Sequence, residues 1–190
     1  MAERTDPRIA RTTQACEAAI VELASELPIS QITVADLAER AKVTRATFYN
    51  HYASPLDLLI QILLTDLRRA DHNDEERRSR GDLAAPELQR ISLGEVADHI
   101  ERYKAIYRQA VDDPADAAVY AALVRYFADY ATWFIARCTH PDLPAANHHI
   151  IAQFLAHGFA GAIKEWLSDN SLTKEDLVDA AVACTPPWWS

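Results

Sequence analysis

Apolar residues recur along most of this chain at alternating steps of three and four, which is the spacing of an amphipathic helix. The first helix that this pattern predicts begins at the pair Asp6-Pro7, and its stripe consists of Ile9, Thr13, Cys16, Ile20, Leu23 and Leu27. No segment alternates apolar and polar residues over a useful length, and the chain contains only four glycines. The sequence therefore predicts an all-α fold.

Two short helices separated by a tight turn are predicted within residues 32–52. Thr33 is placed to cap the first helix, and Asp36 is placed to complete a capping box with it. The run Lys42-Val43-Thr44 then breaks the helix, and its threonine is placed to cap a second helix over residues 45–52. This order of elements is typical of a helix-turn-helix.

The second of these helices divides into an inward and an outward side. Phe48 and Tyr52 are four residues apart and share one face, so we expect them to pack inward. The side chains left outside are Arg45, Thr47, Tyr49, Asn50 and His51. Arginine can bind guanine or phosphate, asparagine can pair with adenine, and the other three types can donate to phosphate oxygens. On periodicity alone, any small helical domain also fits this pattern.

The order and spacing of the residues carry more information than the periodicity. Residues 32–58 resemble the N-terminal domain of the TetR/AcrR family of bacterial transcriptional repressors, whose pattern runs roughly as I-T-v-x-D-L-A-x-x-A-G-V-S-x-x-T-x-Y-x-H-F-x-s-K-x-x-L. The matching residues are Ile32, Thr33, Asp36, Leu37, Ala38, Ala41, Val43, Thr44, Thr47, Tyr49, His51, Tyr52, Ser54 and Leu58. Two positions differ from the pattern. Lys42 replaces the turn glycine, at a cost of about 1 kcal/mol if the backbone is left-handed there, and Pro55 replaces a phosphate-binding lysine.

The resemblance implies that the helix-turn-helix binds double-stranded DNA. We expect base contacts from Arg45, Thr47 and Asn50, and phosphate contacts from Thr33, Thr44, Tyr49 and His51. Lys42 adds positive charge beside the turn. Because the N-terminal segment has few cations, its affinity is expected to depend on dimerisation and on base contacts.

The resemblance also implies two domains: a helix-turn-helix DNA-binding domain over residues 1–54 and a helical ligand-binding and dimerisation domain over residues 55–190. The run Ser54-Pro55-Leu56-Asp57 predicts the start of the fourth helix, which we expect to end near residue 71. Residues 71–90 are highly charged and are predicted to form a frayed helix end and a loop. Further helices are predicted from a capping box at Ser92 and Glu95 and over residues 115–138, 145–168 and 174–184, which gives about nine helices in all.

Aromatic residues are concentrated in the middle of the predicted second domain. Those predicted to line a pocket for a small apolar or aromatic effector are Tyr103, Tyr107, Tyr126, Phe127, Tyr130 and Phe134. Such side chains offer apolar bodies with a few hydroxyl groups, which is the usual composition of a ligand pocket. An aromatic stripe is also typical of an ordinary core, so the pattern alone leaves both interpretations open.

The segment before the last predicted helix is rich in small residues. The resemblance implies that the last two helices of each subunit pack against those of a second copy, which predicts a homodimer. The residues predicted at this interface are Phe154, Gly158, Gly161, Ala162 and Trp166. A close crossing of helices within one chain is the alternative explanation of the small residues. A dimer would place two recognition helices in successive major grooves, roughly 34–36 Å apart, on a pseudo-palindromic site.

The net charge of the chain is −9, which by itself argues against a DNA partner. The charge is unevenly distributed: residues 1–55 contain 6 Lys and Arg against 7 Asp and Glu, a balance of −1, whereas residues 56–190 contain 13 against 21, a balance of −8. The acidic excess therefore belongs mainly to the predicted second domain. The N-terminus is charged, and no long apolar run occurs, so we expect a cytoplasmic protein without a membrane span.

Catalytic patterns are absent from the sequence. The seven histidines and three cysteines are scattered without metal-ligand spacing, and there is no glycine-rich phosphate loop or nucleophile elbow. We therefore expect no enzyme activity, no cofactor and no bound metal. The alternative to a DNA-binding regulator is a helical adaptor that keeps the fold without binding DNA, an interpretation that Lys42, Pro55 and the acidic balance favour.

Overall fold

The computed structural model describes residues 7–81 and 83–189, and every regular element in these residues is a helix. The α-helices are α1 (Pro7–Glu26), α2 (Val34–Arg40), α3 (Arg45–Tyr49), α4 (Pro55–Arg80), α5 (Ala85–Arg102), α6 (Lys104–Asp112), α7 (Ala117–Ile135), α8 (His148–Ser168) and α9 (Lys174–Cys184). Three short 3₁₀ turns are η1 (Ile29–Gln31), η2 (Pro114–Asp116) and η3 (Pro187–Trp189). Within the described residues, no helix is both long and apolar enough for a membrane crossing.

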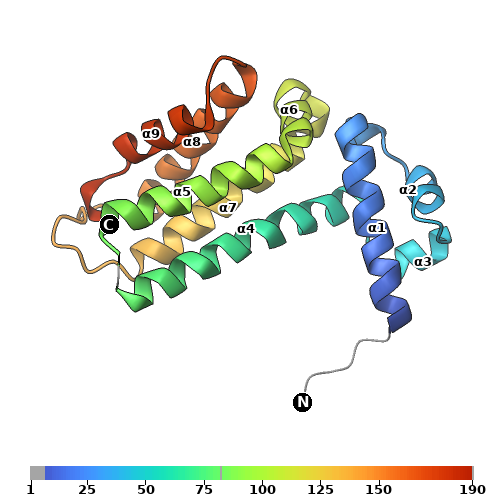
Figure 1. Cartoon of the computed structure of the whole chain (residues 1–190), viewed down its shortest axis with the longest axis horizontal. Coiled ribbons are helices and arrows are strands. Elements are labelled where there is room, and N and C mark those ends of the chain that lie inside the picture. The colour runs from blue at the N-terminus through green and yellow to red at the C-terminus, as the bar shows by residue number, and fades with distance from the viewer. Residues whose placement is uncertain (1–6, 82, 190) are drawn as a thin grey trace.

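The helices form a small unit at one end of the molecule and a larger bundle beside it (Figure 1). α1 packs against α2, and α2 against α3. The long helix α4 starts next to this unit and continues along the bundle, where it contacts α5 and α7. α7 and α8 share the largest contact in the bundle, and α9 packs on α5 and α8. α4 is therefore the element that extends from the small unit through the bundle.

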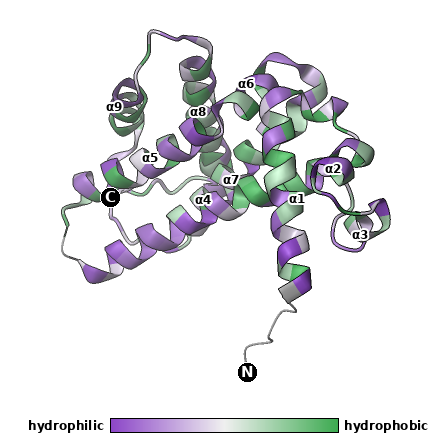
Figure 2. Cartoon of the chain, turned by 45° about the vertical axis from the view of Figure 1, so that its right-hand side comes forward, coloured by the Kyte–Doolittle hydropathy of each residue, from purple (hydrophilic) through white to green (hydrophobic). Residues whose placement is uncertain are grey.

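One hydrophobic core connects the small unit and the bundle. Its buried residues run from Cys16 and Phe48 near the N-terminus through Leu67 of α4 to Trp166 and Val178. Figure 2 shows hydrophilic residues along the outer turns of α4 and hydrophobic residues where α4 meets α1 and α7. Because the apolar contacts continue across the start of α4, the two parts of the chain are packed together rather than joined by a free linker.

The region predicted as a frayed end and loop, residues 71–90, is mostly helical. α4 continues to Arg80 and ends at Gly81, whose φ of 65° is the left-handed conformation that glycine adopts readily. Side-chain ion pairs hold the charged turns of this helix, among them Arg78 with Asp74, four residues apart, and Arg77 with Glu95 of α5. The prediction was wrong because half of these partners lie in another helix.

Other predicted helix limits also need correction. The capping box at Ser92 and Glu95 does not start a helix, because α5 begins at Ala85. The Ser92 hydroxyl instead donates to the Leu88 carbonyl oxygen and to Asp74. This part of the chain forms two helices, α5 and α6, which meet at Tyr103. α7 and α8 are shorter than predicted, and α9 has the predicted limits, 174–184. The predicted first cap, Asp6, lies outside the described residues.

Candidate functional site

Side-chain caps fix the geometry of the helix-turn-helix. Thr33 and Asp36 form the predicted capping box, in which the Thr33 hydroxyl accepts the Asp36 N–H at 3.2 Å and the Asp36 carboxylate accepts the Thr33 N–H at 3.0 Å. Thr44 caps α3 by accepting the Thr47 N–H at 3.0 Å. Ser54 caps α4 in the same way. These local bonds hold both short helices at the turn, and each cap contributes about 1 kcal/mol.

The turn itself keeps the left-handed backbone that its position in the pattern predicts. Lys42 has a φ of 55°, the only positive φ of a non-glycine residue within residues 7–81 and 83–189. The lysine therefore bears a backbone cost of about 1 kcal/mol that a glycine would not. α3 is shorter than predicted and ends at Tyr49, yet Phe48 and Tyr52 are buried together as expected, with ring centroids 5.5 Å apart.

Most of the side chains predicted to contact DNA are exposed. The exposed ones are Thr33, Lys42, Thr44, Arg45, Tyr49, Asn50 and His51. Thr47 is half-buried, and its hydroxyl lies 2.8 Å from that of Thr44. These residues come from one short segment around α3, so they share one end of the molecule. Their roles at DNA stay predictions.

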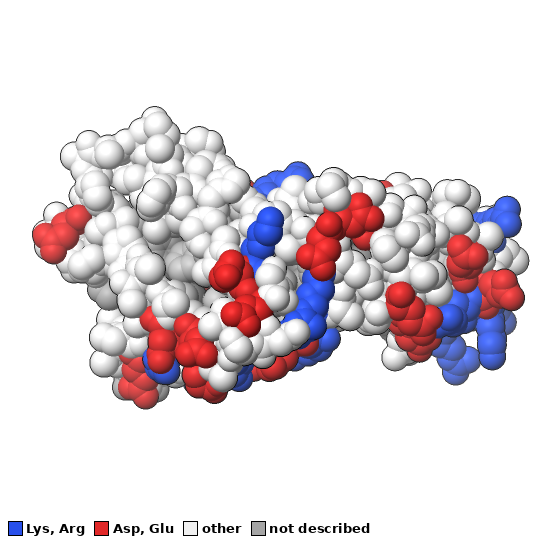
Figure 3. Space-filling view, turned by 90° about the horizontal axis from the view of Figure 1, so that it is seen from above, with Lys and Arg blue, Asp and Glu red and all other residues white. Residues whose placement is uncertain are grey.

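The charges of this end are mixed, but two cations remain available. Arg40 forms ion pairs with Glu22 at 3.2 Å and with Glu26 at 3.7 Å. Within the described part of the chain, neither Lys42 nor Arg45 has an acidic group within ion-pair distance. Figure 3 shows Lys and Arg side chains projecting at this end among Asp and Glu. The positive charge next to the recognition helix is therefore small and local.

A cavity lies inside the bundle between α4, α5, α7, α8 and α9. Its volume is about 80 Å³, and most of its lining is apolar. Of the six aromatic residues predicted to line a pocket, Tyr126, Phe127 and Tyr130 do so. Sequence reasoning missed the lining residues of other elements, including Asp71, Asp74, Arg78 and Trp189. The aromatic run on α7 therefore supplies one wall only.

The other predicted pocket residues lie elsewhere, which corrects that part of the prediction. Phe134 lines a shallow groove and stacks on Trp189, with ring centroids 4.3 Å apart. Tyr107 is buried, and its hydroxyl lies 2.8 Å from His99 Nε2. Tyr103 lies between α5 and α6 and packs on the same histidine ring.

His99 explains why these two tyrosines face away from the cavity. Its Nδ1 lies 2.9 Å from a carboxylate oxygen of Asp66 on α4, so the ring joins α4, α5 and α6. Burial lowers the pKa of His99, and the hydrogen bond that His99 donates to Asp66 opposes that effect only in part. The neutral ring donates from Nδ1 to Asp66 and accepts the Tyr107 hydroxyl at Nε2. Tyr103 and Tyr107 therefore belong to the packing around His99 between α4, α5 and α6.

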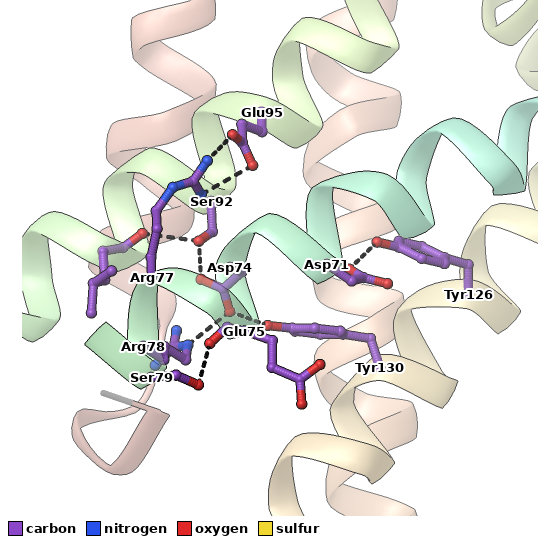
Figure 4. Close-up of polar contacts among 11 residues, drawn as sticks. Asp71, Asp74, Glu75, Arg77, Arg78, Ser79, Ser92, Glu95, Tyr126 and Tyr130 are labelled. Carbon is purple, nitrogen blue, oxygen red and sulfur yellow. Dashed lines mark hydrogen bonds and ion pairs between the residues drawn. The ribbon is translucent and has the colours of Figure 1, made fainter. Parts of the chain in front are cut away.

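Asp74 is the centre of a polar network at the cavity wall (Figure 4). It is 2% exposed and accepts hydrogen bonds from Arg78 Nε at 2.7 Å, from the Tyr130 hydroxyl at 2.8 Å and from the Ser92 hydroxyl. These donors come from α4, α7 and α5. The guanidinium of Arg78 also lies over the Phe134 ring. A buried carboxylate with this many donors is well stabilised.

Asp71 lies one turn before Asp74 and is less well satisfied. The Tyr126 hydroxyl donates to its Oδ1. Burial raises the pKa of Asp71 to about 6, the negative charge of Asp74 adds to the rise, and the hydrogen bond from Tyr126 and the charge of Arg68 oppose it. The carboxylate is thus held beside an apolar cavity without a cationic partner of its own.

Comparison with known proteins agrees with this arrangement. Residues 18–62 match the family model described as bacterial regulatory proteins, tetR family. This segment contains α2, the turn and α3. The helix-turn-helix of this chain is therefore similar to that of the TetR family. An uncharacterized HTH-type transcriptional regulator of Bacillus subtilis, YxbF, is 36% identical over 58 residues, which are 30% of this chain and 15% of that protein.

Solved structures of TetR-family proteins share the whole fold. A TetR transcriptional regulator from Streptococcus agalactiae is 25% identical, with a TM-score of 0.61 over 93% of this chain and 94% of that one. The repressor FadR of Thermus thermophilus, solved in complex with lauroyl-CoA, is 17% identical, with a TM-score of 0.63 over 90% of this chain and 91% of that one. The N-terminal helix-turn-helix and the C-terminal helical part are therefore the TetR-family arrangement.

The α8 surface of this chain is apolar and largely uncovered. Phe154 is 78% exposed and Ile150 is 67% exposed. Gly158 and Gly161 are also exposed, and Ala162 is half-buried. In Figure 3 a broad area without Lys, Arg, Asp or Glu covers one end of the molecule. Of the five residues predicted at a dimer interface, Phe154, Gly158 and Gly161 are exposed on α8, whereas Ala162 also lines the cavity.

Trp166 is not part of that surface. It is 2% exposed and belongs to the core of its own chain, with Lys104 Nζ over its ring at 5.3 Å. Its place among the predicted interface residues was wrong because the apolar stripe of α8 turns inward toward the end of the helix. Ile150, which the sequence reasoning did not select, is the exposed apolar residue one turn before Phe154.

A further residue without any local sequence signal joins the small unit to the bundle. Asp116, at the start of α7, is 1% exposed, and its carboxylate accepts the N–H groups of Ile29 and Ser30, both at 2.9 Å. Those groups lie in η1, 86 and 87 residues earlier in the chain. Asp116 thus ties the segment between α1 and α2 to the bundle.

Proposed function

We propose that this protein is a TetR-family transcriptional repressor that binds a pseudo-palindromic operator as a dimer and is released by a small apolar or aromatic effector. Residues 1–54 bind DNA, residues 55–190 bind the effector and the second subunit, and the protein acts in the cytoplasm. The observation that carries the proposal is that α4 starts immediately after the exposed recognition segment and supplies one wall of an internal cavity.

The chemistry of the exposed segment supports DNA as the partner. Arg45 presents five donors in a planar fork that matches guanine or phosphate, and Asn50 presents the amide pattern that pairs with adenine. Both are exposed at α3. Of the described cations close to the turn, Lys42 and Arg45 are the two that form no ion pair, so the nonspecific electrostatic contribution is small and specificity rests on base contacts.

Two glycines of α8 support the dimer. A glycine within a helix costs about 1 kcal/mol relative to alanine. A Cβ atom added at Gly158 or Gly161 would meet nothing within 4 Å in this chain, so packing within the subunit does not explain either glycine. They lie beside the exposed Phe154 on an uncharged stretch of helix. A second copy of α8 approaching closely accounts for both the small residues and the exposed aromatic ring.

The position of α4 supports control by an effector. Its C-terminal half lines the cavity through Asp71, Asp74 and Arg78, and its N-terminal end follows α3. A ligand that binds one position of α4 more tightly than another shifts the population of the two states and so changes the separation of the recognition helices. The lauroyl-CoA bound to the similarly folded FadR supports an effector with an apolar body.

Substitution of Arg45 by alanine tests the DNA-binding role. Gel-shift titration of the region upstream of the gene is expected to show specific binding that weakens with salt. The Arg45→Ala variant is expected to bind with about 1–3 kcal/mol less free energy and to lose preference at one base pair. Arg40→Ala is the matched control, because Arg40 is already paired with Glu22 and Glu26. No binding by the wild-type chain at low salt supports the adaptor function instead.

Substitution of Phe154 by glutamate tests the dimer. The wild-type chain is expected to sediment as a dimer at micromolar concentration, and Phe154→Glu is expected to sediment as a monomer because it places a charge in the centre of an apolar interface. Gln61→Glu is the control, since it adds the same charge at an exposed position of α4, away from α8. A wild-type monomer at this concentration, or an unchanged dimer in the glutamate variant, contradicts the interface.

A further inference from the structure

The charges around the cavity do not balance. Three charged side chains line it: Asp71, Asp74 and Arg78. Arg78 and Asp74 form an ion pair, with Nε and Oδ2 2.7 Å apart, so they neutralise each other. Among residues 7–81 and 83–189, no cation lies within ion-pair distance of Asp71, and its hydrogen bond comes from the uncharged hydroxyl of Tyr126. The cavity lining therefore carries one net negative charge when Asp71 is ionised.

Asp71 also keeps an unused acceptor. Among the residues that the structure describes, no donor lies within hydrogen-bonding distance of its Oδ2. In Figure 4 this oxygen is turned away from the Tyr126 hydroxyl, whereas both oxygens of Asp74 are engaged. A carboxylate held beside apolar surface with one oxygen unpaired gains most from a cation that brings its own donors.

The surface outside the cavity has the same sign. Asp71, Tyr126 and Tyr130 line both the cavity and an open groove between α4 and α7, so they form the wall between the two. The charged residues of the groove are Asp57, Asp71, Glu75 and Asp129 against Arg68 and Arg125, a balance of −2 with neutral His72. The field of the groove therefore favours the approach of a cation and opposes that of an anion.

We propose that the effector is an apolar molecule with one basic nitrogen, and that Asp71 binds this nitrogen in its protonated form. The inference rests on the proposed ligand-responsive function and specifies the chemical class of the ligand. The ammonium group donates to Asp71 Oδ2, and the rings of Tyr126 and Tyr130 offer cation–π contacts beside it. The apolar body occupies the space next to Phe127 and Ala162, and because a cavity of about 80 Å³ is smaller than such a molecule, binding displaces α4 outward. An anionic head group at the same place is repelled by the carboxylate of Asp71.

Three ligands with one skeleton and different charge test the inference. Phenethylamine, phenethyl alcohol and phenylacetate share an aromatic ring and differ in the group that would face Asp71. In calorimetric titrations of the full chain near neutral pH, phenethylamine is expected to bind about tenfold more tightly than the alcohol, a difference of about 1.4 kcal/mol. Phenylacetate is expected to bind most weakly of the three.

Two variants assign the preference to one carboxylate. Asp71→Asn is expected to remove the tenfold preference for the amine over the alcohol. Glu75→Gln makes the same change of charge four residues further along α4, at an exposed position outside the cavity lining, and is expected to keep the preference. Circular dichroism of both variants checks that the helices are retained.

The possible failures are distinguishable. If phenylacetate binds as tightly as the amine, or if Asp71→Asn keeps the amine preference, the proposed charge of the effector is wrong but an effector cavity remains. If none of the three ligands binds, the effector part of the proposed function is contradicted together with the inference. DNA binding in the gel-shift assay is independent of both results.

Discussion

Replacing Asp116 by alanine is expected to lower the free energy of unfolding by about 3 kcal/mol. The buried carboxylate accepts the N–H groups of Ile29 and Ser30, and the alanine variant leaves both donors without their acceptor. Charge-assisted hydrogen bonds of this kind contribute about 1.5–3 kcal/mol each. In the alanine variant, water can partly replace the bond to the half-buried Ser30 N–H, so the expected loss is less than the sum of the two bonds. Urea denaturation at a fixed protein concentration measures the loss, because the stability of a dimer depends on concentration.

A neighbouring aspartate provides the matched control. Asp113 lies three residues earlier, and its carboxylate accepts the Ala115 N–H at 2.8 Å in a local turn. Asp113→Ala is expected to cost about 1 kcal/mol or less, as for other capping residues. A loss below about 1 kcal/mol in Asp116→Ala would mean that the contact between η1 and the start of α7 contributes little to the folded state.

Replacing Asp74 by leucine is expected to have an effect of similar size, about 3 kcal/mol. The change leaves the guanidinium of Arg78 and the hydroxyl group of Tyr130 without their buried acceptor, whereas the Ser92 hydroxyl keeps the Leu88 carbonyl oxygen. The full cost of an unpaired buried charge is reduced here because the Arg78 side chain is 21% exposed and can reach water. Denaturant unfolding measured by circular dichroism provides the comparison with wild type.

A double-mutant cycle separates the ion pair from the rest of the network. Arg78→Met removes the charge that Asp74→Leu leaves unpaired, so the double variant is expected to be more stable than Asp74→Leu alone by about 1–2 kcal/mol. Asp74→Asn is a milder control, because its amide oxygen still accepts hydrogen bonds. If the double variant is as unstable as the sum of the two single variants, Arg78 and Asp74 act independently and the network interpretation fails.

The parts of the fold that depend on neighbours in sequence were predictable. The caps at Thr33, Thr44 and Ser54 all appear in the structure, because each involves a side chain and a backbone N–H three residues later. The same holds for the pairing of Phe48 with a ring four residues away. These signals lie within one helical turn, so a single sequence contains both partners side by side.

The errors concern contacts between distant segments. The charged turns of α4 looked like a loop because their partners Ser92 and Glu95 lie on another helix. Tyr107 looked like a pocket residue because nothing in its own helix reveals His99 behind it. Asp71 was missed because its environment is formed by α7, whose Tyr126 is 55 residues away. The roles of the residues at DNA and at the dimer surface stay predictions.

The length of α4 has a mechanical consequence. The helix has 26 residues and is therefore about 39 Å long. A rigid rod of that length that tilts by about 5° at one end displaces its other end by about 3 Å. A molecule that binds against the acidic turns of α4 therefore needs to rotate the helix only slightly to move the recognition segment by about the length of a hydrogen bond. Contacts with base edges require accurate placement, so a shift of this size is enough to break them.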